Sequence, residues 1–153
     1  MNKTTLIKFF ASGFYSSYSK LYPGTTGTVP AWLIAYFLVG GSDTAVIIAA
    51  VALTIISVWL ASLAEDVYGH DAKKIVIDEW AGMFITVILL PHSLLNYFIA
   101  FIAFRGCDAV KIWPANIAER LPRGWGVTAD DVVAGIQANL LTHLIVYIIN
   151  SYI

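Results

Sequence analysis

The 153 residues are enough for one compact domain and too few for two of ordinary size, so we predict a single domain over residues 1–153. Apolar residues make up 59% of the chain and charged residues only 12%, about half the roughly 25% typical of soluble domains, which favours a small integral membrane protein over an unusually apolar soluble bundle. The net charge of −1 also excludes a nucleic-acid-binding protein, which needs a basic excess.

The apolar residues form five blocks, and a shorter amphipathic segment precedes them. Residues 1–19 predict a helix on the membrane surface, with an apolar face of Leu6, Ile7, Phe9, Phe10 and Phe14. The five blocks are residues 29–41, 44–64, 75–90, 94–104 and 132–153, with tight turns at 40–43 and 91–93. Strand-type alternation does not persist anywhere. We therefore predict an all-α fold, an integral membrane bundle of about five hydrophobic helices plus a short N-terminal interfacial helix.

The charged residues fall on one side of this predicted bundle. If the blocks cross the membrane in alternation, segments 21–28, 65–74 and 105–131 share one side, and all nine Lys and Arg and every carboxylate except Asp43 lie on it or near it. Basic residues accumulate on the cytoplasmic side of membrane proteins, so we expect this side to face the cytoplasm. Two of the blocks are short for a hydrocarbon core of about 30 Å, which predicts a polar pocket just below the cytoplasmic interface.

A glycine- and threonine-rich segment directly precedes the first apolar block. Gly24 and Gly27 allow backbone N–H groups to approach an anion closely, and Thr25, Thr26 and Thr28 add hydroxyl donors in front of a helix N-terminus. One interpretation is a phosphate-binding loop. The other, which the segment alone favours, is a capped turn with Thr28 as the N-cap residue.

Two adjacent carboxylates, Asp78 and Glu79, follow the apolar residues Ile75, Val76 and Ile77. Burial of unpaired charge costs free energy, so a divalent cation or a basic side chain is expected to compensate them. The alternative is an ordinary helix N-terminal turn, where acidic residues complement the helix dipole. The apolar residues in front of the pair favour metal binding.

Arg105, Asp108 and Lys111 recur at every third position and would be neighbours on a helix. Arginine binds a phosphoryl group through two hydrogen bonds and lysine binds it as a point charge, while Asp108 is placed to orient Arg105 or to bind a metal. An ion-paired helix end explains this segment equally well.

Asp130 and Asp131 open the last predicted helix. Capping is the simpler interpretation there, unless this helix end faces Asp78 and Glu79.

Glu65 and His70 are weaker candidates on the same charged side. Surface solvation is the simpler interpretation of Glu65, and His70 is a candidate proton shuttle. Together with His92 and His143, His70 does not form a zinc site at recognisable spacing.

Taken together, these segments resemble phosphatidylglycerophosphatase A, a family of small integral membrane phosphatases of bacteria. The matching motifs, in order, are Pro-Gly-Thr-Thr-Gly-Thr at 23–28, Ile-Val-Ile-Asp-Glu at 75–79 with Gly82-Met83, Phe104-Arg105 together with Asp108, Lys111 and Trp113-Pro114, and Asp130-Asp131 with Ala134-Gly135. Asp71 falls where the family has an Asp shortly before its Asp-Glu pair. Each motif is weak alone, but four in order over residues 21–135 are specific. Ile112 replaces a proline that is common in the family, so we expect the helix there to run slightly longer.

The resemblance implies Mg²⁺-dependent hydrolysis of the phosphomonoester of phosphatidylglycerophosphate to phosphatidylglycerol and inorganic phosphate, within phospholipid biosynthesis at the bacterial inner membrane. The expected partners are this phospholipid substrate and the lipid bilayer, with no nucleic acid; the oligomeric state stays open. The expected catalytic residues are Asp78, Glu79, Arg105, Asp108, Lys111 and Asp131. The expected metal ligands are Asp78, Glu79, Asp108, Asp130 and Asp131. The expected substrate-binding residues are Gly24, Thr25, Thr26, Gly27, Thr28, Arg105 and Lys111.

A small cation transporter or channel is the alternative from another class, because carboxylates inside a membrane also mark ion paths. That function predicts carboxylates at mid-helix depth. Here they cluster at predicted helix ends on one side, which favours the enzyme. The attacking nucleophile is either a water molecule or one of these carboxylates, and the sequence does not distinguish the two.

Overall fold

The computed structural model describes residues 2–69 and 72–152, which form helices and turns with no strand among them. The predicted all-α fold is therefore confirmed. The helices are α1 (Lys3–Ala11), α2 (Pro23–Ile34), α3 (Asp43–Tyr68), α4 (Ile77–Thr86), α5 (Leu94–Val110), α6 (Ala115–Ala118) and α7 (Gly124–Tyr152), with a 3-10 turn, η1 (Ser16–Tyr18), and a π-helical segment, η2 (Ala35–Val39).

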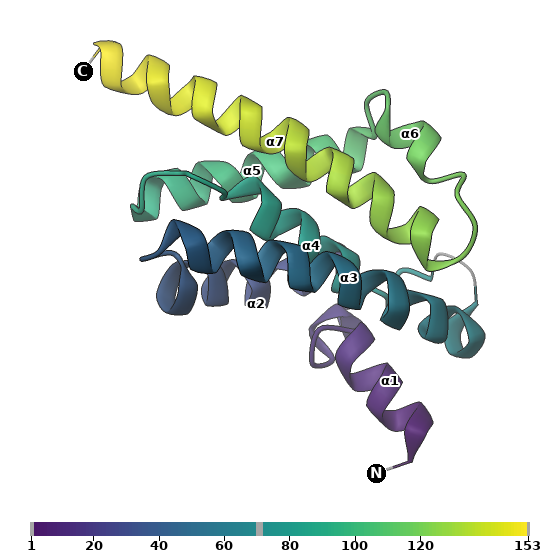
Figure 1. Cartoon of the computed structure of the whole chain (residues 1–153). Coiled ribbons are helices and arrows are strands. Elements are labelled where there is room, and N and C mark those ends of the chain that lie inside the picture. Colours follow the sequence, from purple (N-terminus) through teal and green to yellow (C-terminus); the bar gives the residue numbers. More distant parts are fainter. Residues whose placement is uncertain (1, 70–71, 153) are drawn as a thin grey trace.

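Helix α4 is the centre of the fold, packed against α2, α3, α5 and α7 (Figure 1). Nine of its ten residues are buried. Ten residues extend only about 15 Å along a helix axis, about half of a hydrocarbon core of roughly 30 Å. The N-terminal end of α4, which carries the adjacent carboxylates, is therefore held inside the surrounding helices.

The ends of the helices are sorted into two groups (Figure 1). The α2–α3 connection, the α4–α5 connection and the C-terminus lie at one end of the molecule, at the left of the view. The end of α3, the end of α5 and the start of α7 lie at the other, near α1 and α6. The segments that were predicted to share the charged side therefore lie at one end of the molecule.

The N-terminal helix is shorter than predicted and ends at Ala11. Gly13, Phe14 and Tyr15 follow it with φ angles of 56°, 61° and 64°, a left-handed conformation that ends a helix. Phe14 therefore lies outside the predicted apolar face of this helix. Its ring packs edge-on against Trp80 of α4, with ring centroids 5.3 Å apart.

Helix α2 begins at Pro23, so the glycine- and threonine-rich segment forms its first turns. Proline is favoured at the first helical position, where no N–H partner is needed. The Oγ1 atoms of Thr26 and Thr28 donate hydrogen bonds to the backbone carbonyls of Tyr22 (3.0 Å) and Gly24 (2.9 Å). The predictions of a loop in front of the helix and of Thr28 as its N-cap residue are therefore wrong.

Helices α5 and α7 also extend beyond their apolar blocks. Asp130 and Asp131 lie inside the second turn of α7, so the capping interpretation is wrong. Helix α5 ends at Val110, because Lys111 adopts a left-handed conformation with φ of 47°. The helix thus ends before Ile112, and the slight lengthening expected from the missing proline is not observed.

Helices α3 and α7 are long and apolar enough to cross a membrane. In each of the two helices, only 28% of an apolar stretch of 18 residues is buried inside the protein, whereas the core helix of a soluble protein is mostly buried. Large apolar side chains are exposed along both helices, such as Ile48, Ile55 and Trp59 on α3 and Leu140 and Tyr147 on α7. Exposed apolar surface of this extent is typical of a membrane protein.

Glycines bring α4 and α7 into close contact. A Cβ atom on Gly135 of α7 would lie 2.6 Å from the carbonyl oxygen and 3.0 Å from the Cα of Gly82 on α4. Thr86 Oγ1 donates to the carbonyl of Gly82 (2.8 Å) and lies 3.3 Å from that of Gly135, its alternative acceptor. The separation of the two helices is thus fixed by backbone contact.

We predict that Gly135→Ala lowers the melting temperature of the detergent-solubilised protein, with a loss of about 1–3 kcal/mol in stability, because backbone atoms cannot yield without separating the helices. The matched control is Gly106→Ala in α5, where a Cβ meets no atom within 4 Å and should be tolerated. Equal melting temperatures for the two variants would contradict the packing argument.

Candidate active site

A polar pocket of about 350 Å³ lies where the N-terminus of α2 and the start of α4 meet the end of α5 and the first turns of α7. The five carboxylates predicted as metal ligands all line it. The lining residues are Pro23, Gly24, Ala72, Lys73, Ile75, Asp78, Glu79, Asp108, Ala109, Lys111, Asp130 and Asp131. Four helices and the segment before α4 thus bring together motifs that are far apart in the sequence.

Glu79 is held from two sides. Its Oε2 is 2.6 Å from Thr28 Oγ1 on α2, and its Oε1 is 3.4 Å from Arg105 Nη1 on α5. The single hydroxyl proton of Thr28 has two alternative acceptors, Glu79 and the carbonyl of Gly24. The carboxylate therefore has a fixed position at the junction of α2, α4 and α5.

Arg105 links three groups through one nitrogen atom. Its Nη1 lies 2.9 Å from Asp108 Oδ2, 3.4 Å from Glu79 Oε1 and 3.4 Å from Thr28 Oγ1. A Cβ on Gly24 would collide with Glu79 Oε1 and would lie 2.8 Å from Arg105 Nη2. Glycine at position 24 therefore lets α2 lie next to this ion pair without displacing its side chains.

Lys111 is bound by two carboxylates. Its Nζ lies 2.8 Å from Asp130 Oδ2 on α7 and 2.8 Å from Glu119 Oε1, just after α6. Burial lowers the pKa of Lys111, but hydrogen bonds to Asp130 and Glu119 outweigh it and raise the pKa above its ordinary value. Lys111 is therefore a permanent positive charge at the pocket.

Asp78 and Asp131 have no cationic partner in the part of the chain that the structure describes. Both are buried, and the ion pairs of the pocket involve the other three carboxylates. Asp78 Oδ1 is buried and has no hydrogen-bond partner among the described residues. A carboxylate in this situation is costly unless a cation compensates it.

The donor set fits a hard divalent cation that takes few protein ligands. Among residues 2–69 and 72–152, no three His, Cys, Asp or Glu side chains already converge as a metal-binding group. Mg²⁺ usually keeps several waters and takes one or two carboxylates together with phosphate oxygens of the substrate. Asp78 and Asp131 meet this requirement.

The model of one protein family, phosphatidylglycerophosphatase A, matches residues 9–146. The chain belongs to the phosphatidylglycerophosphatase A family. Proteins named phosphatidylglycerophosphatase A in Escherichia coli and Haemophilus influenzae are 36% identical over 132 residues (82% of this chain, 75% of the relative) and 30% identical over 145 residues (92% and 89%). A protein of Bacteroides thetaiotaomicron, provisionally named a phosphatidylinositol-3-phosphatase, is 33% identical over 140 residues (85% and 87%). No solved structure matches the chain significantly.

Membership of the phosphatidylglycerophosphatase A family confirms the resemblance inferred from the motifs. It also confirms the predicted class of enzyme, a lipid phosphatase with phosphatidylglycerophosphatase activity. The alternative of a cation transporter receives no support from these relatives.

The structure separates the residues of the Gly-Thr motif of this family. Gly24 lines the pocket, and Thr28 Oγ1 contacts the carboxylate of Glu79 in the pocket lining. Gly27 packs α2 against α4, because a Cβ there would lie 2.7 Å from Val76, and its carbonyl accepts a hydrogen bond from Trp80 Nε1 (2.9 Å). Thr25 and Thr26, also predicted to bind substrate, are not among the lining residues.

Of the weaker candidates only Glu65 lies among the described residues, and two residues that were not predicted, Lys73 and Glu119, contribute to the pocket lining and to the ion pair of Lys111 respectively. Glu65 lies near the end of α3 and is not among the described lining residues; His70 and Asp71 fall outside the described part of the chain. Lys73 lines the pocket, and its position next to the Asp-Glu motif is the signal that would have identified it. Glu119 follows a helix, α6, that lacks an apolar pattern, so the sequence offered no comparable signal for it.

Proposed function

We propose that this phosphatidylglycerophosphatase A family member uses Mg²⁺ in the polar pocket to hydrolyse the phosphomonoester of phosphatidylglycerophosphate. The observation that carries the proposal is the coexistence of two kinds of group at one polar pocket. Among the described residues Asp78 and Asp131 lack a cation, while Lys111 in the pocket lining and Arg105, which contacts Glu79 and Asp108 of that lining, are cations that carboxylates hold in place. A metal ion together with a phosphate group would satisfy both.

Asp78 and Asp131 would hold Mg²⁺, and Asp108, Asp130 and Glu79 complete the acidic surroundings. When bound, the ion supplies charge neutralisation at the phosphoryl oxygens and a template for the attacking water.

The side chains of the pocket would bind and orient the phosphoryl group. Arg105 and Lys111 are placed to neutralise the charge on its equatorial oxygens. Gly24, at the start of α2, leaves room beside Arg105 near a helix N-terminus, which favours anions. Hydrolysis forms a bond between phosphorus and the water oxygen and breaks the bond to the glycerol oxygen, which leaves with a proton as phosphatidylglycerol.

We expect full-length protein purified in detergent to release inorganic phosphate from phosphatidylglycerophosphate when Mg²⁺ is present. Excess chelator should stop the release, and added Mg²⁺ should restore it. Phosphatidylinositol 3-phosphate serves as the comparison substrate, because one relative carries the name of that activity. Release that continues in chelator would refute metal dependence, and preference for the inositol lipid would change the proposed substrate.

The proposed setting is the bacterial inner membrane, crossed several times, with the pocket facing the cytoplasm. The apolar outer faces of α3 and α7 support membrane insertion. The charged segments gather at the same end as the pocket, and positive charge accumulates on the cytoplasmic side. The half-length α4 would place its N-terminal carboxylates near the cytoplasmic interface.

This topology predicts opposite labelling of two engineered cysteines. Gly41 lies in the turn at one end, where a Cβ meets no atom within 4 Å, and Arg120 is exposed near α6 at the other. A membrane-impermeant maleimide should label Gly41→Cys in intact cells and Arg120→Cys only after permeabilisation. The wild-type chain, whose single Cys107 is buried, is the control. The reverse pattern would invert the proposed orientation.

A further inference from the structure

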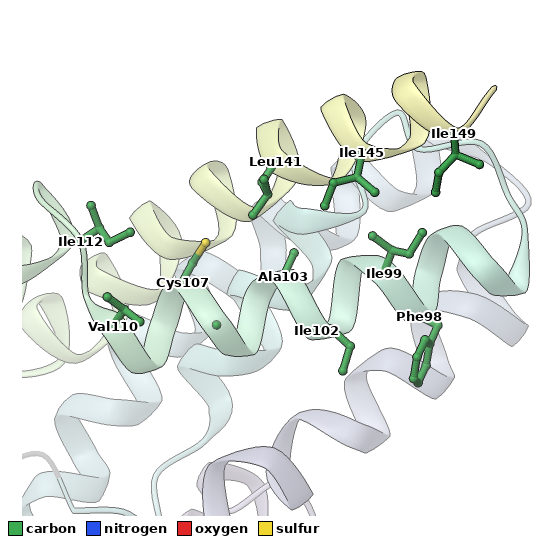
Figure 2. Close-up of a pocket in the computed structure, with 11 residues that line it drawn as sticks. Phe98, Ile99, Ile102, Ala103, Cys107, Val110, Ile112, Leu141, Ile145 and Ile149 are labelled. Carbon is green, nitrogen blue, oxygen red and sulfur yellow. The ribbon is translucent and has the colours of Figure 1, made fainter. Parts of the chain in front are cut away.

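A second cavity, entirely apolar, runs between α5 and α7 (Figure 2). Its volume is about 660 Å³, and its eleven lining residues are aliphatic or aromatic residues, one glycine and one cysteine. Two rows of side chains at four-residue spacing form its walls, and each row is continuous because this spacing follows one face of a helix. The rows are Ile99, Ala103 and Cys107 on α5 and Leu141, Ile145 and Ile149 on α7.

This groove and the polar pocket share the last turn of α5. Asp108 and Lys111 line the pocket, whereas Cys107 and Val110 line the groove. Gly106 also lines the groove, and because a Cβ there would meet no atom within 4 Å, this end of the groove is open. The apolar cavity therefore begins within one helical turn of the candidate active site.

The groove has the depth of one membrane leaflet. It extends along α5 from Val110 to Phe98, a separation of twelve positions, which corresponds to about 18 Å at the helical rise of 1.5 Å per residue. One half of a hydrocarbon core of about 30 Å is about 15 Å deep. An acyl chain whose head group lies at the interface reaches this depth.

We propose that the groove binds one acyl chain of the phospholipid substrate and thereby positions its head-group phosphate in the polar pocket. The inference rests on the proposed function, because the occupant is the lipid whose phosphate is hydrolysed. Three observations support it: the wholly apolar lining, the position of Cys107 and Val110 next to Asp108 and Lys111 in the chain, and the leaflet-like depth.

The expected contribution of the groove is positioning. An acyl chain gains no hydrophobic free energy when it leaves the bilayer for a protein groove, because lipid tails are as apolar as the side chains. Contact with two rigid helices does fix the chain, and therefore the phosphate attached to it, relative to Arg105 and Lys111. Misplacement of a reacting group by about 1 Å can reduce the rate about a hundredfold.

The test compares Ile145→Trp, which fills the groove, with Ile148→Trp, which adds the same side chain on the exposed face of α7. Each full-length variant is assayed with phosphatidylglycerophosphate carrying hexadecanoyl or butanoyl chains. Ile145→Trp should reduce kcat/KM for the long-chain substrate by about tenfold or more and leave the short-chain value unchanged, because only the long chain reaches this depth. Ile148→Trp should change neither value. Equal effects on both substrates, or none, would overturn the proposal.

A second variant and a binding readout keep the test decisive. Gly106→Leu blocks the end of the groove next to the pocket, and it repeats the comparison if Ile145→Trp fails to fold. In vesicles, phosphatidylglycerol with a photoreactive diazirine in one acyl chain should label residues 98–112 and 141–149, and Ile145→Trp should reduce this labelling.

The remaining outcomes separate the two proposals and the other occupants. Labelling spread evenly over the exposed face of α3 would indicate bulk lipid, and cross-linking of two chains through Cys107 would place a second copy in the groove; both outcomes overturn the acyl-chain site. A wild-type chain that is labelled in the groove but hydrolyses neither lipid would instead refute the proposed function.

Discussion

Asp78→Asn is expected to reduce kcat for phosphatidylglycerophosphate by at least about a hundredfold, as for loss of a group that stabilises transition-state charge. Asp78 is buried at the first turn of α4, and its Oδ1 has no hydrogen-bond partner within residues 2–69 and 72–152. Asparagine has nearly the same shape but no negative charge, so it would fill the space without attracting a divalent cation.

The same substitution should leave the metal-free protein folded. Asp78 faces repulsion from Glu79, Asp130 and Asp108, so removal of its charge relieves an unfavourable interaction. A ligand that binds only the folded state raises the melting temperature, and Mg²⁺ should do so for the wild-type chain. In Asp78→Asn this Mg²⁺-dependent increase should be greatly reduced, while the melting temperature in chelator stays the same or rises.

Phosphate release and thermal unfolding, each measured with Mg²⁺ and with chelator, check both expectations. Asp66→Asn is the matched control, because Asp66 is 65% exposed and pairs with Arg123 at 2.7 Å outside the pocket. The control should retain wild-type activity and the full response to Mg²⁺. Near-normal turnover in Asp78→Asn would remove this residue from the site.

The hydrophobic pattern predicted the helical class and the approximate positions of the main helices, because long apolar runs must be buried or face lipid whatever their partners are. It failed where helices begin in polar sequence. The first turns of α2 are stabilised by hydroxyl groups that bond to carbonyls one turn back, and those of α7 by a buried contact between Ser57 and Thr128 at 2.8 Å. Such contacts depend on neighbours that the sequence alone does not place.

The carboxylates and cations of the site were predicted from their cost of burial and their spacing, and the three-residue spacing also offered Asp108 as a partner of Arg105. The partners of Lys111 were not predicted, because they lie on segments whose packing the sequence alone does not place. The structure shows that Asp130 and Glu119 hold Lys111, while Asp108 and Glu79 hold Arg105. The choice depends on the antiparallel packing of α5 and α7, which brings the end of one helix to the start of the other (Figure 1).

The second large effect is expected at Arg105, where lysine should not replace arginine. Nη1 makes all of the hydrogen bonds and ion pairs that the guanidinium has among the described residues, and Nε is buried without a partner there. Nε and Nη2 form one edge of the guanidinium, and such an edge binds two oxygens of a phosphoryl group at once. Gly24 leaves space beside Nη2 on this edge, since a Cβ would lie 2.8 Å from it.

Arg105→Lys keeps the positive charge but offers a single point of contact, so we expect at least about a hundredfold loss of kcat/KM. Arg105→Gln, which also removes the charge, should be less active still. The ratio of the kcat/KM values of the two variants separates the contribution of the two-point hydrogen-bond geometry from that of the charge. Arg123→Lys, at the exposed pair with Asp66, is the matched control and should behave as wild type. If Arg105→Lys retained activity within a few-fold of the wild-type chain, the two-point contact with phosphate would be wrong, and Arg105 would act only as a charge that holds Glu79 and Asp108.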